Sequence, residues 1–223
     1  MKNNTIIILF SGMFILFSCG EASDVKSGEG TSKADADTLV VPEVVSAAYK
    51  LLADKSTITW DRKLDQKSMK RTMKILGADV QVDMDAVTLN MSGNVTPKNG
   101  SLITTDDVPE SGDLFFDMAT FKFAAEKGNG LFDTKTYPTS ELKFIAFTSD
   151  TLEGSYHSKC ELTIQEHMEK MEIPVTISIE NDTVSMTGTF SFNTLKFPLR
   201  APDQQATVNK DEITVKLNLV YVK

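Results

Sequence analysis

Cysteine and histidine are scarce in this sequence, with two of each among 223 residues, and this scarcity limits the chemistry of the chain. A metal site built from His157, Cys160 and His167 is disfavoured, because odd separations along a strand place Cys160 on the opposite face from both histidines. Nucleophilic catalysis requires a base that a third group holds in place, and no such set is visible in the sequence. We therefore expect no metal site, no catalytic residues and no enzymatic activity.

Basic residues are also in the minority. Lys and Arg number 23 against 31 Asp and Glu, which gives a net charge of −8. An acidic chain repels phosphate backbones, so nucleic acid is not an expected partner. Helical periodicity is nearly absent as well, and only Asp65–Leu76 leaves room for a helix.

The N-terminal residues have the features of a targeting segment. The apolar run from Ile6 to Phe17 follows Lys2 and is too short to span a bilayer comfortably, which is typical of a secretory signal peptide. Leu16–Gly20 is similar to a bacterial lipobox, in which the cysteine, here Cys19, is lipidated and becomes the first residue of the mature protein. The alternative is an ordinary signal peptide with an incidental cysteine.

This interpretation divides the chain into three parts. Residues 1–18 are the predicted lipoprotein signal peptide, residues 19–47 a lipidated cysteine with a disordered tether, and residues 48–223 a folded domain. The tether is small and polar, so it buries too little apolar surface to offset the entropy of ordering. We expect a lipoprotein of the bacterial cell envelope whose acyl chains anchor it to a membrane. Gly20 after the cysteine is consistent with delivery to the outer membrane, and the sequence leaves the leaflet and the oligomeric state open.

The clearest strand signal runs from Lys159 to Glu180. Apolar and polar residues alternate before and after a polar break at residues 166–170, which predicts an antiparallel hairpin with one apolar face on each strand. Cys160 lies on the first of these faces. Because Cys160 has no partner once Cys19 is lipidated, we expect it to act as a small buried hydrophobe.

The same alternation recurs at short spacing from Tyr49 to the end of the chain. It shifts by one residue near Asp85-Ala86, which predicts a bulge or a turn there. Pro97–Gly100 predicts a turn, and Leu131–Pro138 a short helical turn. Many short strands in one domain are typical of a sandwich or a barrel, and a barrel of eight strands can hold one small ligand.

Segments distributed along this domain resemble, in their order and spacing, the YceI-like family of lipid-binding proteins. They are Ser56–Trp60, Gly112–Met118, Phe132–Pro138 with Phe144 after it, Leu162–Ile164 with Ile173–Val175 after a polar turn, and Asp211–Leu219. Together they extend over residues 49–223. The resemblance implies an all-β, antiparallel, lipocalin-like barrel whose elongated apolar lumen holds a polyisoprenoid, isoprenoid quinone or fatty-acyl chain, without catalysis and without a cofactor. The family often has an arginine in its penultimate strand, where this chain has Asn193–Lys196.

One side of each alternating strand is the predicted wall of the lumen. The predicted wall residues are Ile58, Trp60, Phe116, Phe144, Leu162, Ile164, Val175, Ile177, Phe190, Phe192, Val215 and Leu217. No convergent set of charged residues is visible, so the sequence leaves the head group of the lipid open.

A second interpretation is a structural or stress-related envelope lipoprotein whose barrel is filled by its own side chains. The 10 methionines and 13 phenylalanines suit an adaptable apolar pocket, and a filled core accounts for them equally well. The side chains that would plug such a lumen are Phe115, Phe121, Phe123, Phe144, Phe147, Phe190 and Phe192. The volume of the cavity distinguishes the two interpretations.

Overall fold

The computed structural model describes residues 44–75, 77–122, 131–200 and 205–223. The chain divides into two compact units, residues 1–41 and 42–223, and all described residues belong to the second. The predicted signal peptide, Cys19 and most of the predicted tether lie outside the described residues. The first strand begins at Ser46, so residues 46–47 belong to the folded domain rather than to the tether.

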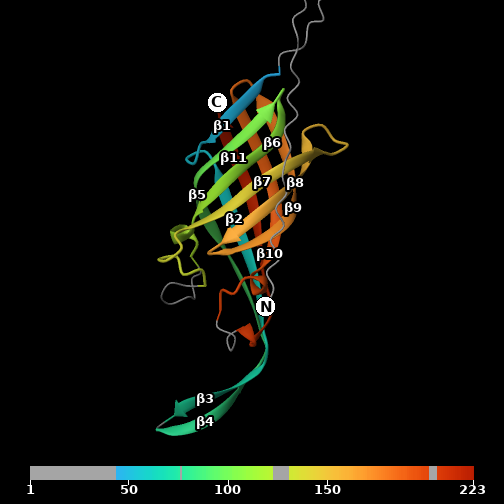
Figure 1. Ribbon diagram of the computed structural model, residues 1–223. Helices are drawn as coiled ribbons and strands as arrows, with labels where there is room; N and C mark the ends of the chain where they lie inside the picture. The colour runs from blue at the N-terminus through green and yellow to red at the C-terminus, as the bar shows by residue number, and fades with distance from the viewer. Residues whose placement is uncertain (1–43, 76, 123–130, 201–204) are drawn as a thin grey trace, which may run out of the picture. The chain divides into compact units, whose positions relative to one another are not determined.

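The described residues form antiparallel strands joined by tight turns and two short 3-10 helices (Figure 1). The strands are β1 (Ser46–Leu51), β2 (Thr57–Gln66), β3 (Met69–Ile75), β4 (Ala78–Met84), β5 (Val87–Thr105), β6 (Val108–Asp117), β7 (Thr139–Ser149), β8 (Ser155–Ile164), β9 (His167–Glu180), β10 (Thr183–Asn193) and β11 (Val208–Val222). The 3-10 helices are η1 (Met118–Thr120) and η2 (Thr194–Lys196). No helix in these ranges is long and apolar enough to cross a membrane.

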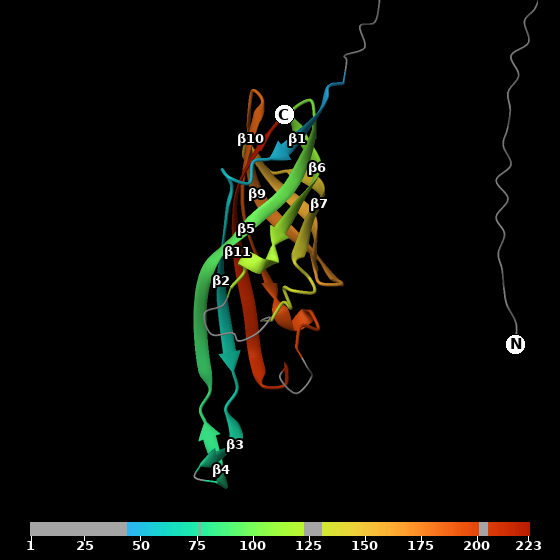
Figure 2. The ribbon, with the colours of Figure 1, turned by 90° about the vertical axis from the view of Figure 1, so that its left-hand side faces the viewer.

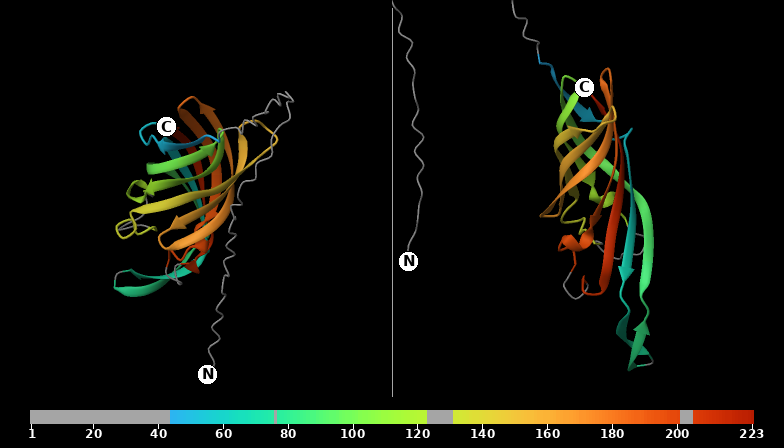
Figure 3. Two further views of the ribbon diagram at one scale, coloured as in Figure 1. Left: turned by 45° about the horizontal axis from the view of Figure 1, so that its top comes forward. Right: turned by 90° about the vertical axis from the view of Figure 1, so that its right-hand side faces the viewer.

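Eight of these strands close into a ring. Each strand from β5 to β11 pairs with the next one along the chain, and β2 pairs with both β5 and β11 (Figure 1 and Figure 3). Closure satisfies the backbone groups that an open sheet would leave at its edges. The predicted all-β antiparallel barrel of the lipocalin-like type is therefore confirmed.

One position in the ring is shared by two strands. β2 lies between residues 87–95 of β5 and residues 208–218 of β11. Beyond the start of β2, the same position is taken by β1, which pairs with residues 101–105 of β5. Its link to β11 is much shorter, because only Lys50 and Leu51 have partners there.

The strands alternate between core and solvent, which explains why this sequence forms a barrel. In β2, the side chains of Ile58, Trp60, Arg62 and Leu64 are buried, and the residues between them are exposed. The same alternation runs along β11 from Ile213 to the end of the strand. Each strand thus contributes an apolar face to one shared interior.

The segment that left room for a helix is instead extended. Asp65-Gln66 ends β2, and Met69–Ile75 forms β3, which pairs with β4 as a separate two-stranded hairpin (Figure 2). Met69 and Met73 lie on one face of β3, with Arg71 between them, as the period of a strand requires. Pairing with β4 overrides the weak helical pattern.

The shift of alternation at Asp85-Ala86 marks a break between β4 and β5 rather than an inserted residue. Met69 faces Met84 in the hairpin, and Gln66 faces Val87 in the barrel, so the register is the same on both sides of the break. The predicted bulge or turn is therefore wrong. The alternation shifts because the apolar face of the hairpin is out of phase with the wall of the barrel, and the strands are interrupted between them.

Two other predicted boundaries need correction. The turn of the hairpin between β8 and β9 is confined to Gln165-Glu166, and residues 167–170 already belong to β9. Pro97–Gly100 does not turn, because an irregularity between Pro97 and Asn99 accommodates it within β5. The turn that follows β5 lies at Asp106-Asp107, and both residues have positive φ, as a type I′ hairpin turn requires.

The segment after the first 3-10 helix forms a single turn. Residues 131–136 are all in turn conformation, and the amide groups of Thr136 and Tyr137 both donate to the carbonyl oxygen of Asp133. Asp133 itself has a positive φ of 41°. The i→i+3 and i→i+4 bonds to Asp133 form a single helical turn, as the sequence predicted, and Phe132, just before it, is buried in the core.

Candidate functional site

The predicted wall residues all face the interior of the barrel. Each of the twelve is buried, with a relative exposure between 0% for Phe144 and 8% for Phe192. The inward phase was read from alternation alone, and the pairing of the strands places all twelve in a single apolar cluster. Their contact with a ligand stays a prediction.

The register of β10, β11 and β2 stacks these inward residues in layers. Val215 faces both Phe190 and Trp60, which defines one layer across three strands. Two residues further along, Ile213 faces both Phe192 and Arg62. The layers are about 7 Å apart, since a strand rises about 3.4 Å per residue.

A small apolar pocket lies in the interior near the first of these layers. Its volume is about 30 Å³, and Ser140 is the one polar residue among those that line it. Its lining residues are Val95, Phe116, Met118, Phe121, Phe132, Ser140, Leu162, Ile164, Phe190, Phe192 and Val215. Such a volume accommodates no more than one or two water molecules.

Aromatic side chains from outside the strands occupy much of this end of the interior. The ring of Phe121, which follows η1, stacks on Trp60 with a centroid distance of 4.8 Å. The ring of Phe132, from the turn at residues 131–136, meets Phe121 edge-on at 5.0 Å. The sequence pointed to Phe121 as a plug, but it did not single out Phe132 or Met118 as part of the pocket.

The predicted plug residues divide into groups. Phe121, Phe144, Phe190 and Phe192 are buried in the interior. Phe115 alternates with the buried Leu114 and Phe116 and therefore lies on the outer face, so its prediction as a plug is wrong. Phe147 is half-buried and stacks on Phe144 at 5.7 Å, and Phe123 lies outside the described residues.

A buried charged cluster lies in the next layers of the same interior. Arg62 donates from Nε and Nη2 to the two carboxylate oxygens of Asp211, at 2.7 and 2.9 Å. Thr194 and Arg200 also donate to Asp211, and Arg200 Nη1 donates to Thr194 Oγ1 at 3.1 Å. The side chains of Arg62 and Asp211 are only 3% and 0% exposed.

This cluster corrects the conclusion that no convergent charged set exists. Arg62 lies in phase with Ile58 and Trp60, and Asp211 in phase with Ile213 and Val215, so both side chains continue the inward side of their strands. Their meeting could not be derived from the sequence, because the partners are 149 residues apart. Thr194 lies within Asn193–Lys196 and accepts a hydrogen bond from Arg200, and it donates to the same carboxylate as Arg62.

The surroundings of Asp211 keep its carboxylate charged. Burial alone would raise the pKa of Asp211, but the hydrogen bonds from Arg62, Thr194 and Arg200, together with the charge of Arg62, lower it below its usual value. A buried carboxylate with two bound guanidinium groups is a stable ionic feature in an apolar interior. It gives this end of the lumen a polar wall.

Cys160 and the two histidines lie on opposite sides of the barrel wall. Cys160 is 2% exposed and faces the core, and burial raises the pKa of its thiol to about 11 despite a hydrogen bond to Ser158. His157 and His167 are on the solvent side, where His157 contacts Glu172 at 3.2 Å and Asp150 at 3.6 Å. This is the separation that strand alternation predicted. No group of three potential metal ligands occurs among the residues that the structure describes.

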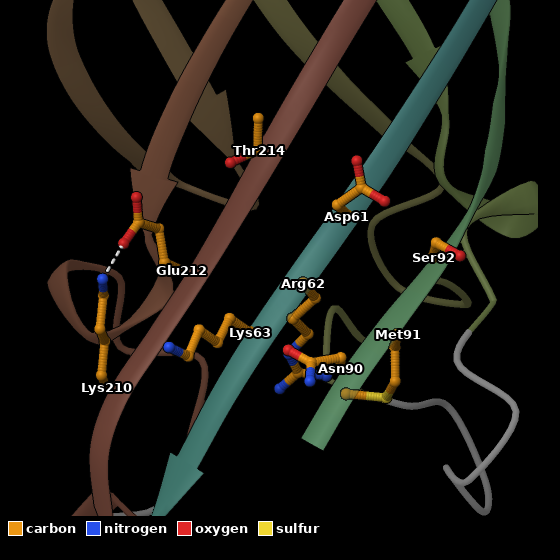
Figure 4. Close-up of a pocket in the computed structure, with 9 residues that line it drawn as sticks. All are labelled: Asp61, Arg62, Lys63, Asn90, Met91, Ser92, Lys210, Glu212 and Thr214. Carbon is orange, nitrogen blue, oxygen red and sulfur yellow. Dashed lines mark ion pairs between the residues drawn. The ribbon is translucent and has the colours of Figure 1, made fainter. Parts of the chain in front are cut away.

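A wider hollow, of about 480 Å³, lies along β11, β2 and β5 (Figure 4). The exposed residues Asp61 and Lys63 contribute to it from β2, together with Lys210 and Glu212 from β11. Lys210 pairs with Glu212 at 2.5 Å, and Asp61 pairs with Lys216 at 3.1 Å. These two pairs compensate part of its charge, and Met91 is the one apolar residue among those that line it.

Comparison with known families identifies the fold of this interior. The model of the YceI-like domain matches residues 49–221, which is nearly the whole folded domain. The chain belongs to the YceI-like family. The match begins in β1 and ends in β11. The strands β2 and β11, whose pairing closes the barrel, are therefore both part of the family domain.

One solved structure of similar fold is the crystal structure of BcnA from Burkholderia cenocepacia. It shares 17% sequence identity with this YceI-like chain, with a TM-score of 0.49. The alignment covers 76% of this chain and 98% of the BcnA chain. The search of curated proteins found no match.

Proposed function

We propose that this protein binds or transports a long-chain amphipathic lipid in the interior of its barrel, without catalysis. The observation that carries the proposal is a closed ring of strands whose inward faces form one apolar cluster from Tyr221 at one end to Phe192 at the other. Each methylene buried in such an interior contributes about 0.8 kcal/mol. A polyisoprenoid, an isoprenoid quinone or a fatty-acyl chain would therefore bind through its hydrocarbon alone.

Binding requires the aromatic side chains over the pocket to move. The pocket of about 30 Å³ is roughly a tenth of the volume of a typical ligand pocket, about 300 Å³ or more. Phe121 and Phe132 are attached to segments outside the strands, so they can leave the interior without breaking the hydrogen bonds of the barrel. We infer that these two side chains exchange places with the lipid chain.

The charged cluster supports an amphipathic ligand rather than a pure hydrocarbon. Arg62 lies two residues from Trp60 on the inner side of β2, about 7 Å along the strand. A polar head group at that depth would meet guanidinium groups of Arg62 and Arg200 instead of an apolar wall. We propose this end of the lumen as the head-group end.

We also propose that the protein is a lipoprotein of the bacterial cell envelope, anchored through Cys19 and delivered to the outer membrane. The support is the lipobox-like sequence Leu16–Gly20 after a short apolar run. Cys19→Ser should leave the precursor uncleaved or release the protein into the soluble fraction, as cell fractionation and mass measurement would show. Unchanged membrane association of the variant would contradict the anchor.

A second candidate function rests on the small volume of the pocket. An interior filled by Trp60, Phe121 and Phe132 is what a structural or stress-related envelope lipoprotein without a ligand would need. The two candidate functions differ in whether the barrel takes up a lipid once an aromatic side chain is removed from the pocket.

Uptake of a lipid probe by matched variants distinguishes them. Phe121→Ala should accelerate or strengthen binding of fluorescent fatty-acid and quinone probes, because it removes a ring from the pocket. Phe147→Ala is the control, since it removes an equal ring that stacks on Phe144 and does not line the pocket. Native mass spectrometry of protein purified from its own envelope should recover a bound lipid. Absence of any extracted lipid, with no probe uptake by either variant, would favour the filled barrel.

A further inference from the structure

The β3–β4 hairpin has two faces of opposite character. Residues that face each other across an antiparallel pair lie on the same side, so the pairs Met69–Met84, Arg71–Val82 and Met73–Val80 share one face. The pairs Lys70–Asp83, Thr72–Gln81 and Lys74–Asp79 share the other. We call the first the apolar face of the hairpin and the second its polar face.

The apolar face is open to solvent. Met73, Val80 and Met84 are 48%, 38% and 41% exposed, and Met69 and Val82 are half-buried. Two-stranded hairpins are only marginally stable in water unless they pack against something. Contiguous apolar surface of this kind on a folded domain is typical of an interaction site.

Charge on the two faces indicates the nature of the partner. The polar face is balanced, with Lys70 paired to Asp83 at 3.8 Å and Lys74 opposite Asp79. The apolar face carries a single charged residue, Arg71, which is exposed and has no hydrogen bond or ion pair among the described residues. A second copy of this face would bury two Arg71 side chains in an apolar interface whose own residues offer no carboxylate to pair with them, which is costly. An anionic lipid surface accepts both features, because acyl chains cover the methionine and valine side chains while phosphate groups meet the guanidinium.

We propose that the apolar face of the β3–β4 hairpin binds the surface of an anionic lipid bilayer. Met69, Met73, Val80, Val82 and Met84 enter the interfacial region of the bilayer, and Arg71 contacts lipid phosphate. This contact is separate from the acyl anchor at Cys19 and from binding of lipid in the barrel. The chain as a whole carries an excess of acidic residues, with a net charge of −8, which opposes contact with an anionic membrane, so the hairpin selects which side of the domain faces the bilayer.

Vesicle co-sedimentation of residues 19–223 carrying Cys19→Ser tests the proposal without an acyl anchor. We expect binding to vesicles of phosphatidylcholine with phosphatidylglycerol, and weaker binding to phosphatidylcholine alone. Met73→Ser with Val80→Ser should weaken binding by about tenfold or more, because two apolar side chains are lost at constant charge. Thr72→Ser with Gln81→Ser is the matched control on the polar face, and it should change binding by less than about twofold. Arg71→Gln should remove the preference for phosphatidylglycerol.

A second measurement reports insertion directly. Trp60 is the one tryptophan of the chain and is 1% exposed, so its emission in the parent protein with the same vesicles is the reference, and it includes any change from lipid that enters the barrel. Met73→Trp should add a fluorescence signal that brominated lipids quench, and Thr72→Trp should not.

Three results would overturn the proposal. They are a parent protein that does not bind anionic vesicles, an equal loss of binding in both pairs of serine substitutions, and size-exclusion chromatography that shows two copies of the chain joined through the apolar face. Far-UV circular dichroism confirms the fold of each variant.

Discussion

At the scale of single residues, the interior is organised around one carboxylate. Asp211 is fully buried and accepts hydrogen bonds from Arg62, Thr194 and Arg200. Removing one member of such a cluster leaves the others buried without compensation, which costs far more than the net contribution of the intact pairs.

Asp211→Asn should therefore lower the free energy of unfolding by about 3–5 kcal/mol. Asp61→Asn is the control, because its ion pair with Lys216 is exposed and should contribute less than about 1 kcal/mol. Urea unfolding at neutral pH measures both. A loss for Asp211→Asn no larger than that of the control would show that the cluster does not stabilise the fold.

The same carboxylate predicts how stability depends on pH. The folded pKa of Asp211 is lowered, whereas in the unfolded chain it is about 3.9. The stabilisation is thus fully present above about pH 4, and it is lost as the pH falls through the folded pKa, because the unfolded state takes up the proton first. Urea titrations across this acid range should give a shallower pH dependence for Asp211→Asn than for the parent. Equal slopes would contradict the lowered pKa.

Cys160 should be chemically inert in the folded protein. Its thiol is buried and its pKa is about 11, so almost no thiolate forms near neutral pH. In a chain carrying Cys19→Ser, Ellman's reagent should detect no thiol under native conditions and one thiol in denaturant. Rapid native modification would mean that strands β7 to β9 open frequently around this residue.

At the scale of elements, close contact between neighbouring strands determines how the wall is built. Gly93 of β5 faces Trp60 of β2 across the ladder. A Cβ atom at Gly93 would lie 2.6 Å from Trp60 Cζ2, which no pair of carbon atoms tolerates. The absence of a side chain at Gly93 thus leaves space for the indole that stacks on Phe121.

Gly93→Ala should destabilise the protein by about 1–3 kcal/mol through overpacking. Combining it with Trp60→Phe should recover part of this loss, because phenylalanine lacks the atom that clashes. Ser92→Ala, at the exposed neighbouring position, is the control for a substitution in the same strand that adds no atom near Trp60. Thermal or urea unfolding of the double-mutant cycle gives the coupling, and strictly additive effects would exclude the contact as the cause.

Alternation was sufficient to predict most of the barrel strands and their inward sides, but not how the strands meet. The inward phase of Trp60, Phe190 and Val215 follows from a period of two, and this is why the barrel wall was predicted correctly. The turn expected at Pro97–Gly100 failed because a local irregularity absorbs proline within a long strand. Contacts such as Arg62 with Asp211, or Phe132 with Phe121, depend on closure and on turns that position side chains over the lumen. Single-sequence periodicity contains no information about them.

At the scale of the whole molecule, closure joins the beginning of the domain to its end. β2 pairs with β11, so residues such as Trp60 and Val215 lie side by side although 155 positions separate them in the sequence numbering. Contacts between residues so far apart in the sequence form only after most of the chain between them is ordered. The barrel should consequently form late in folding.

Refolding should take milliseconds to seconds, as for other domains dominated by distant strand pairing. Stopped-flow fluorescence can follow it through Trp60, which lies on the closing seam and becomes 1% exposed. The change in Trp60 fluorescence should coincide with, or follow, the gain of strand signal in circular dichroism. Burial of Trp60 within microseconds would indicate that the seam forms before the barrel does.

The shared position of β1 and β2 in the ring has a mechanical consequence. Tension applied to the chain ahead of Val44 reaches β1 first. This strand pairs with β5 over Ser46–Lys50 and with β11 at only Lys50 and Leu51, which is a shorter pairing than β2 has on either side. Behind it, Ser56 Oγ donates to Leu52 O and accepts from the amide of Val220, which clamps the chain before β2 begins. Under load, β1 should therefore detach first, while the hydrogen bonds of Ser56 keep the eight-stranded ring of β2 and β5–β11 closed.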